Sequence, residues 1–290
     1  MRKSIYDILG KRFNIVNEYE KLYELFTDEK VYKYGIYTYS LANLFNKFIE
    51  EWKFRATYRN TEEILNDLNL MEDTDEEHAM NDILYLIELI LNIDLFIENK
   101  TKDLDKKYFD YDDKNVTLIY KKSNITMENI EILLKELGYK YVKKPKDKIL
   151  LRKNNVIAIE TAQIVENNSI ADLILDYTDF RIENDLKAKK DILNSLGQYL
   201  EPLRKDIKKI DSNLEDYIFF CLNKLNIRHN NKSGKKKIEF VSKLKKKEII
   251  AWYDKIYDLI IIAIRLLELP NSFKEFKELK TKIINEKETV

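Results

Sequence analysis

Apolar residues recur at helical spacing along the N-terminal third of the chain. Two stripes stand out, namely Leu41, Leu44, Phe45, Phe48 and Ile49, and then Ile83, Leu86, Ile87 and Ile90. Because side chains three and four positions apart share one helix face, both stripes predict amphipathic helices. Between them, Asn60 or Thr61 is placed to cap a shorter helix. Residues 1–105 are therefore predicted to form a helical N-terminal region.

The pattern changes after Lys100, where residue types typical of strands appear. The candidate strands are Asn115–Tyr120, Ile149–Leu151 and Val156–Ile159. A helix is predicted between the first two, from Thr126 to Leu137, with Gly138 ending it. The order of strand, helix, strand and strand favours a small α/β insert over residues 106–165.

Helical periodicity returns from Ser169 onward. The predicted helices include Leu186–Leu200, Asn213–Leu225 and Glu248–Leu269. Pro270 would end the last of these, and a lysine-rich break separates it from the helix before it. Residues 166–290 thus read as a helical C-terminal region. The fold class predicted for the chain is mainly α, a multi-helix bundle with a small α/β insert.

Composition agrees with long helices and excludes several kinds of site. Only 5 Gly and 3 Pro occur in 290 residues, so few turns can be made. The one cysteine, Cys221, cannot build a disulfide framework, and the 2 histidines, His78 and His229, cannot build a multi-histidine metal site. The chain has no phosphate-binding glycine loop and no nucleophile elbow. No metal and no cofactor is predicted.

Neither export nor a membrane span is expected. The N-terminus is charged and lacks the apolar core of a signal peptide. The most apolar stretch, Ile256–Leu269, contains Asp258, Arg265 and Glu268 and falls short of the roughly 20 apolar residues that a span needs. The expected location is the cytoplasm, with no membrane association.

The most distinctive polar cluster follows an apolar helix. Arg228 can neutralise a phosphate by a bidentate contact, and His229 can move a proton near neutral pH. Together they are candidate catalytic residues for metal-independent RNA cleavage. The next two residues, Asn230 and Asn231, can bind a ribose or a base edge. They can equally cap the preceding helix and stabilise the loop.

The only dense basic run comes directly after this cluster. Lys232, Lys235, Lys236 and Lys237 are candidate RNA-binding residues, and four more lysines follow between positions 243 and 247. The chain has 51 basic and 51 acidic residues, so only a local patch could attract nucleic acid. The other interpretation of the run is a solvated surface.

A second cluster joins basic and aromatic residues, Trp52-Lys53-Phe54-Arg55, with Arg59 close behind. On a helix, Arg55 and Arg59 would share a face and could reach one anion. Trp52 and Phe54 are read as core or interface residues in preference to platforms for stacking bases.

The C-terminal third resembles the HEPN-like helical domains of bacterial abortive-infection proteins. The resemblance rests on Ile227-Arg228-His229-Asn230-Asn231 at a helix end, a polar loop, and a helix that opens with Trp252-Tyr253-Asp254. The wider chain looks like a group of Firmicutes proteins that share this end. In the usual motif four to six residues separate the arginine from the histidine, whereas here they are adjacent. Adjacent residues of a regular helix point about 100° apart, so both could face one phosphate only from a helix end or a loop.

The resemblance implies an antiphage protein that cleaves or binds RNA as a toxin. It implies a homodimer in which two Arg228-His229 clusters line one cleft, and it leaves room for a phage or antitoxin protein as a partner. The alternative class is a non-enzymatic interaction or scaffold protein of a phage-defence system. In that case Arg228 would be engaged by a buried carboxylate such as Asp254 or Asp258, and the polar loop would only end a helix.

Overall fold

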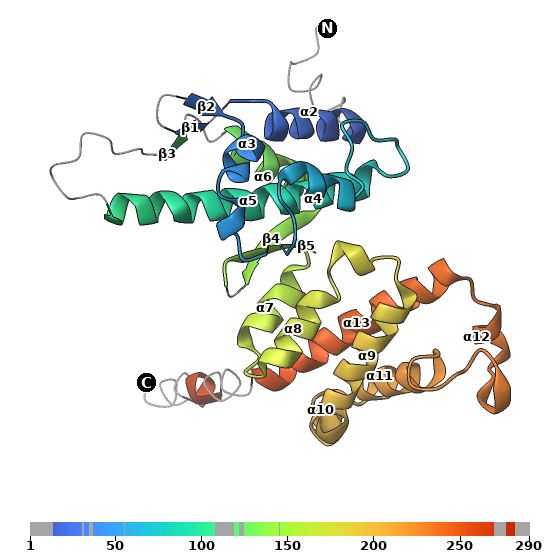
Figure 1. The fold of residues 1–290 in the computed structure, drawn as a ribbon. Helices are drawn as coiled ribbons and strands as arrows, with labels where there is room; N and C mark the ends of the chain where they lie inside the picture. Colours follow the sequence, from blue (N-terminus) through green and yellow to red (C-terminus); the bar gives the residue numbers. More distant parts are fainter. Residues whose placement is uncertain are drawn as a thin grey trace, which may run out of the picture. The chain divides into compact units, whose positions relative to one another are not determined.

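The computed structural model describes residues 14–30, 32–34, 37–54, 56–107, 119–121, 125–144, 146–269 and 277–281. It is mainly helical, as predicted (Figure 1). The chain divides into two compact units, Met1–Leu151 and Arg152–Val290. No helix among the described residues is long and apolar enough to cross a membrane.

The N-terminal unit contains helices and short strands. They are α2 (Ile15–Thr27), β1 (Tyr32–Tyr34), β2 (Tyr37–Tyr39), α3 (Leu41–Asn46), the 3-10 helix η1 (Ile49–Glu51), α4 (Thr61–Asp67), α5 (Ala79–Lys107), β3 (Ile119–Lys121), α6 (Ile125–Leu137), β4 (Tyr139–Lys144) and β5 (Lys148–Lys153). Helix α2 packs on α5 through Tyr19, Leu22 and Phe26, whose spacing places them on one face. Asn60 caps α4, as predicted.

A small sheet ties a later segment to the beginning of the chain. Its order is β2-β1-β3, with Tyr32 opposite both Tyr39 and Lys121. Because β3 pairs with β1, it belongs to the same unit as the N-terminal helices. The two units divide the chain at residue 151, and residues 106–165 do not form a unit of their own. The first part of the predicted strand, residues 115–118, lies outside the described residues.

The predicted helix ending at Leu137 is confirmed, and Gly138 follows it with φ +75°, a conformation that glycine adopts without strain. The predicted strand over Ile149–Leu151 is also confirmed, within β5, which pairs with β4. The tyrosine hairpin of β1 and β2 was not predicted, because strands of three residues leave no measurable alternation.

The prediction of a strand over Val156–Ile159 is wrong, because these residues begin helix α7 (Val156–Ile164). A short apolar run fits a buried strand and a helix equally well by pattern alone. The side chain of Asn155 decides between them, since its Oδ1 accepts a hydrogen bond from the Ala158 amide at 3.0 Å and so caps a helix. Ala158 and Thr161, three positions apart, are the residues that α7 buries.

The rest of the C-terminal unit consists of helices. They are α8 (Asn168–Asp176), η2 (Phe180–Ile182), α9 (Leu186–Leu200), η3 (Glu201–Leu203), α10 (Arg204–Ile210), α11 (Ser212–Lys224), η4 (Gly234–Lys236), α12 (Glu239–Lys243) and α13 (Lys246–Glu268). Helices α7, α9, α10 and α11 all pack on α13, and α8 packs on α7 and α9 (Figure 1). The three long helices predicted here therefore match α9, α11 and α13 to within a few residues.

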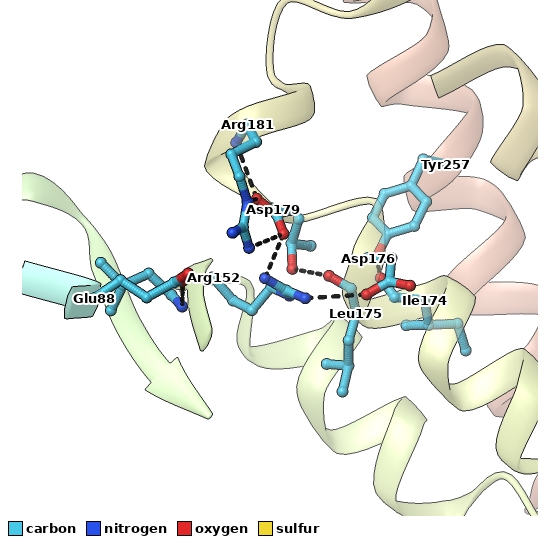
Figure 2. A network of polar contacts seen from close by, with 10 residues as sticks. Glu88, Arg152, Ile174, Leu175, Asp176, Asp179, Arg181 and Tyr257 are labelled. Carbon is cyan, nitrogen blue, oxygen red and sulfur yellow. Dashed lines mark hydrogen bonds and ion pairs between the residues drawn. The ribbon is translucent and has the colours of Figure 1, made fainter. Parts of the chain in front are cut away.

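The buried guanidinium of Arg152 forms ion pairs at the start of this unit (Figure 2). Arg152 is only 2% exposed, and it contacts Asp179 at 2.6 Å and Asp176 at 3.0 Å. Arg181 contacts the same Asp179 carboxylate at 2.7 Å. Burial alone would raise the pKa of Asp179, but the hydrogen bonds from Arg181 and the charge of Arg152 outweigh burial and hold that pKa below its usual value. The carboxylate is thus kept ionised between α8 and η2.

Arg152→Met should destabilise the C-terminal unit by about 3 kcal/mol, because it leaves a buried carboxylate without one of its cations. The matched control is Lys153→Ala, which removes an exposed ion pair to Glu183 and should cost less than about 1 kcal/mol. Urea unfolding followed by circular dichroism measures both. Equal losses in the two variants would contradict the structural role of Arg152.

Candidate functional site

The polar cluster predicted from the sequence lies in a loop beyond the end of α11. The helix ends at Lys224, and Asn226 then adopts φ +61°, a left-handed conformation that asparagine tolerates better than most residues. Tyr253 of α13 donates a hydrogen bond to the Asn226 carbonyl at 3.3 Å. Burial raises the pKa of Tyr253 to about 12, so this hydroxyl stays a donor. Arg228 and His229 therefore follow a fixed turn and are not restricted to one helix face.

The side chain of Arg228 turns toward α9 and η3 and is 16% exposed. Its Nη2 donates to the Gly197 carbonyl at 2.9 Å, and its Nη1 lies 2.6 Å from Glu201 Oε2. Two of its donor groups are thus engaged inside the unit. The scaffold interpretation predicted a buried carboxylate such as Asp254 or Asp258 as the partner of Arg228, whereas the carboxylate found here, Glu201, is 46% exposed.

Arg228 is one part of a larger charged network. Glu201 also contacts Arg204 at 3.4 Å, and Arg204 donates twice to the buried Glu215, at 2.8 and 2.6 Å. Both guanidiniums lie near the ring of Phe219, with the Cζ of Arg204 at 4.1 Å and that of Arg228 at 5.4 Å from the centroid. The network links η3, α10, α11 and the loop.

Gly197 lets Arg228 come this close to α9. A Cβ at this position would lie 2.7 Å from Leu222 Cδ1 and 3.2 Å from Arg228 Nη2. Leu222 is fully buried, so its side chain has little room to yield. Any side chain at position 197 would therefore push α11 or Arg228 away.

The two asparagines stabilise the loop, which was one of the two interpretations of these residues. Asn231 is 2% exposed, accepts from the Asn226 amide at 3.0 Å and donates to the Lys236 carbonyl at 3.2 Å. Asn226 Oδ1 in turn accepts from the Asn231 amide at 3.1 Å. Asn230 is exposed, and its side chain accepts from the amides of Lys232 and Ser233. Asn231 is thus out of reach of a ligand, whereas Asn230 is at the surface.

His229 takes a different direction from Arg228. Its Nδ1 lies 3.3 Å from the Lys236 ammonium near the surface. Lys232 reaches back to the Leu244 carbonyl at 3.3 Å, and Lys237 pairs with Glu239 at 3.1 Å. Lys235 is exposed and has no carboxylate partner among the described residues. The loop therefore brings His229 and Lys236 together near the surface and keeps Arg228 inside.

An exposed aromatic residue inside the basic run was missed by sequence reasoning. Phe240 of α12 is 62% exposed, and Glu239 beside it holds Lys237 and Lys243, each at 3.1 Å. The hydrogen bonds from these two lysines lower the pKa of Glu239. The signal in the sequence was an aromatic residue flanked by charged residues within the lysine-rich run, and the structure adds that its ring is exposed.

The second predicted cluster is only partly described. Arg55 lies outside the described residues, so its predicted pairing with Arg59 is not seen. Arg59 contacts Glu63 at 2.5 Å. Within the described part of the chain, no group of three or more His, Cys, Asp or Glu residues could hold a metal ion.

Comparison with known proteins gives no family for this chain. No family model matches it, and neither the curated proteins nor the solved structures include a match.

Asn231→Ala should destabilise the protein by about 1–3 kcal/mol, because the buried Asn226 amide would lose its acceptor. Lys235→Ala, at an exposed position in the same loop, should change stability by less than about 0.5 kcal/mol. Thermal and urea unfolding would measure the difference. A fully stable Asn231→Ala protein would mean that the loop does not need this amide.

Proposed function

We propose that the C-terminal unit binds single-stranded RNA through a basic segment, residues 228–247, as an RNA-directed toxin of an antiphage abortive-infection system. The observation that carries the binding proposal is local charge. This segment contains nine basic residues and one acidic residue in a chain whose formal net charge is zero. Such a concentration of charge attracts a phosphate backbone even when the whole molecule is neutral.

The ordered loop supports this proposal. Asn230 accepts hydrogen bonds from the amides of Lys232 and Ser233, and Asn231 donates one to the Lys236 carbonyl, so the lysines are presented from a fixed turn. Lys235, Lys246 and Lys247 have no carboxylate partner among the described residues and are exposed. These three ammonium groups could therefore contact phosphates without first breaking an ion pair with a described carboxylate.

Phe240 favours a single strand as the ligand. An exposed phenyl ring between lysines can stack on an unpaired base while the ammonium groups contact the backbone. Bases in a duplex are stacked on one another and offer no free face. The toxin and defence roles rest on the resemblance of the Ile227–Asn231 segment to HEPN-like proteins.

Cleavage would depend on His229 as the proton-transfer group. Its ring lies beside Lys236, whose charge could stabilise a phosphate that gains negative charge. Arg228 would act in this reaction only after leaving Glu201 and Gly197. A homodimer, with a second loop facing the first, would supply further cations.

A second candidate is a non-enzymatic interaction protein of the same kind of system. It is favoured by one observation, the engagement of Arg228 by Glu201 at 2.6 Å. In this case the basic segment would contact an acidic protein surface, for example that of a phage or antitoxin protein.

Phe240→Ala should weaken binding of a labelled single-stranded RNA by about 5- to 150-fold, the range expected for one stacked base. Fluorescence anisotropy at several salt concentrations would measure it. The matched control is Tyr37→Ala, an equally exposed aromatic residue of the other unit, which should have no effect. Unchanged affinity in Phe240→Ala would remove the stacking argument.

Cleavage of total RNA and tRNA in EDTA should be abolished by His229→Ala, because this variant lacks the proposed proton-transfer group. Arg228→Ala would lower activity too, but its structural contacts make a fold check by circular dichroism necessary. If the wild-type protein bound RNA without cleaving it, the protein would be an RNA-binding protein and not a nuclease. If the wild-type protein neither bound nor cleaved RNA, the result would favour the interaction protein.

A further inference from the structure

A cavity of about 270 Å³ lies in the N-terminal unit, where η1 ends beside α5. The basic segment has no part in it. Its walls include Glu51, Trp52, Lys53, Phe54, Phe96 and Asn99. Phe96 and Asn99 come from neighbouring turns of α5 and therefore share a face. The chain leaves η1 in an extended conformation at Trp52, which brings Trp52 and Phe54 to the same cavity.

One side of the cavity is aromatic. The rings of Trp52 and Phe54 are 5.8 Å apart and stand at 81° to each other. Phe45, which is fully buried, fixes Trp52 at 5.1 Å and Phe96 at 5.8 Å, both edge to face. A flat ring that stacks on one of two perpendicular rings meets the other by its edge, and aromatic pairs favour both arrangements. The wall therefore suits a planar aromatic ligand.

The other side is polar, with one loosely held cation. Lys100 pairs with Glu51, whereas Lys53 lies 3.6 Å from Asp147. The Lys53 side chain is 49% exposed, so the ion pair contributes little and can be exchanged for another anion; its Nζ also lies 5.1 Å from the centroid of the Phe54 ring, which leaves the Trp52 ring as the stacking surface. The amide of Asn99 makes no side-chain hydrogen bond with any described residue and can offer both a donor and an acceptor.

We propose that this cavity binds a nucleotide. The base would stack in the aromatic corner with its polar edge on Asn99, and the phosphate would contact Lys53 at the mouth. A donor and an acceptor on one amide match the edge of a nucleobase. The volume lies just below the range of about 300–1,000 Å³ that is usual for ligand pockets, which suits a ligand no larger than one nucleotide. The source of this chemistry is either a free nucleotide or a terminal nucleotide of RNA.

The chain offers a specific reporter for this site. It contains 2 tryptophans, Trp52 and Trp252, one in each unit. In the full-length Trp252→Phe protein, all tryptophan fluorescence comes from the cavity. Titration with AMP, GMP, CMP or UMP should quench it saturably with at least one of them, while ribose 5-phosphate, which has no base, should not. Adenosine should bind more weakly than AMP.

Two variants test the phosphate contact and the base contact separately. Lys53→Ala should weaken binding of the quenching nucleotide about tenfold but leave the corresponding nucleoside unchanged, since only the phosphate contact is lost. Asn99→Ala should weaken both. Lys33→Ala, at an exposed lysine of the same unit outside the cavity, is the matched control and should change neither.

The outcomes are distinct. Quenching by an RNA oligonucleotide but by no mononucleotide would support the same site with RNA as its source. No saturable quenching by either, in a protein with an intact circular dichroism spectrum, would overturn the proposal, as would equal binding of AMP and ribose 5-phosphate. Phe240→Ala leaves the cavity unaltered and Lys53→Ala leaves the basic segment unaltered, so failure at one site does not imply failure at the other.

Discussion

Burial of helix α13 is the constraint on which the C-terminal unit depends. Its buried residues are Ile249, Ile250, Tyr253, Ile256, Tyr257, Ile260, Ile261, Ala263 and Ile264, which lie along one broad face of the helix. A helix with one broad apolar face must be covered by neighbours along that face, and helices α7, α9, α10 and α11 pack on it. Its two buried tyrosines add direction, because Tyr257 stacks on Tyr177 at 4.0 Å and donates to the Ile174 carbonyl, while Tyr253 holds the turn after α11. The position of the polar loop is therefore a consequence of core packing.

This packing gives the conspicuous polar motif two separate roles. Its inner members, Arg228 and Asn231, bind the Gly197 carbonyl, the Glu201 carboxylate and the Asn226 amide. Its outer members, His229 and Asn230, remain at the surface with the lysines. Residues that are adjacent in sequence thus lie in the interior and near the surface respectively. A motif of polar residues at a helix end is ambiguous for this reason.

Much of the fold could be predicted from sequence because long amphipathic helices carry a strong periodic signal, as in Leu186–Leu200, which matches α9 at both ends. The signal is weak for short elements, so the tyrosine hairpin was missed and the Val156 run was read as a strand when Asn155 caps a helix. The direction of Arg228 could not be predicted, since it depends on Gly197, 31 positions earlier in the chain. Phe240 lies within the basic run, but only its exposure in the structure distinguishes it from a core residue.

Gly197 has a consequence for how this protein could diverge. The missing side chain there is filled by Leu222 and by the Arg228 guanidinium, so three distant positions occupy one volume. A larger residue at 197 would be tolerated only with a smaller one at 222 or with the loss of the arginine. Among related sequences, positions 197, 222 and 228 should therefore co-vary as a group, while neighbouring exposed positions such as Gln198 should drift independently. Such co-variation would reflect the volume that these three positions share in the core.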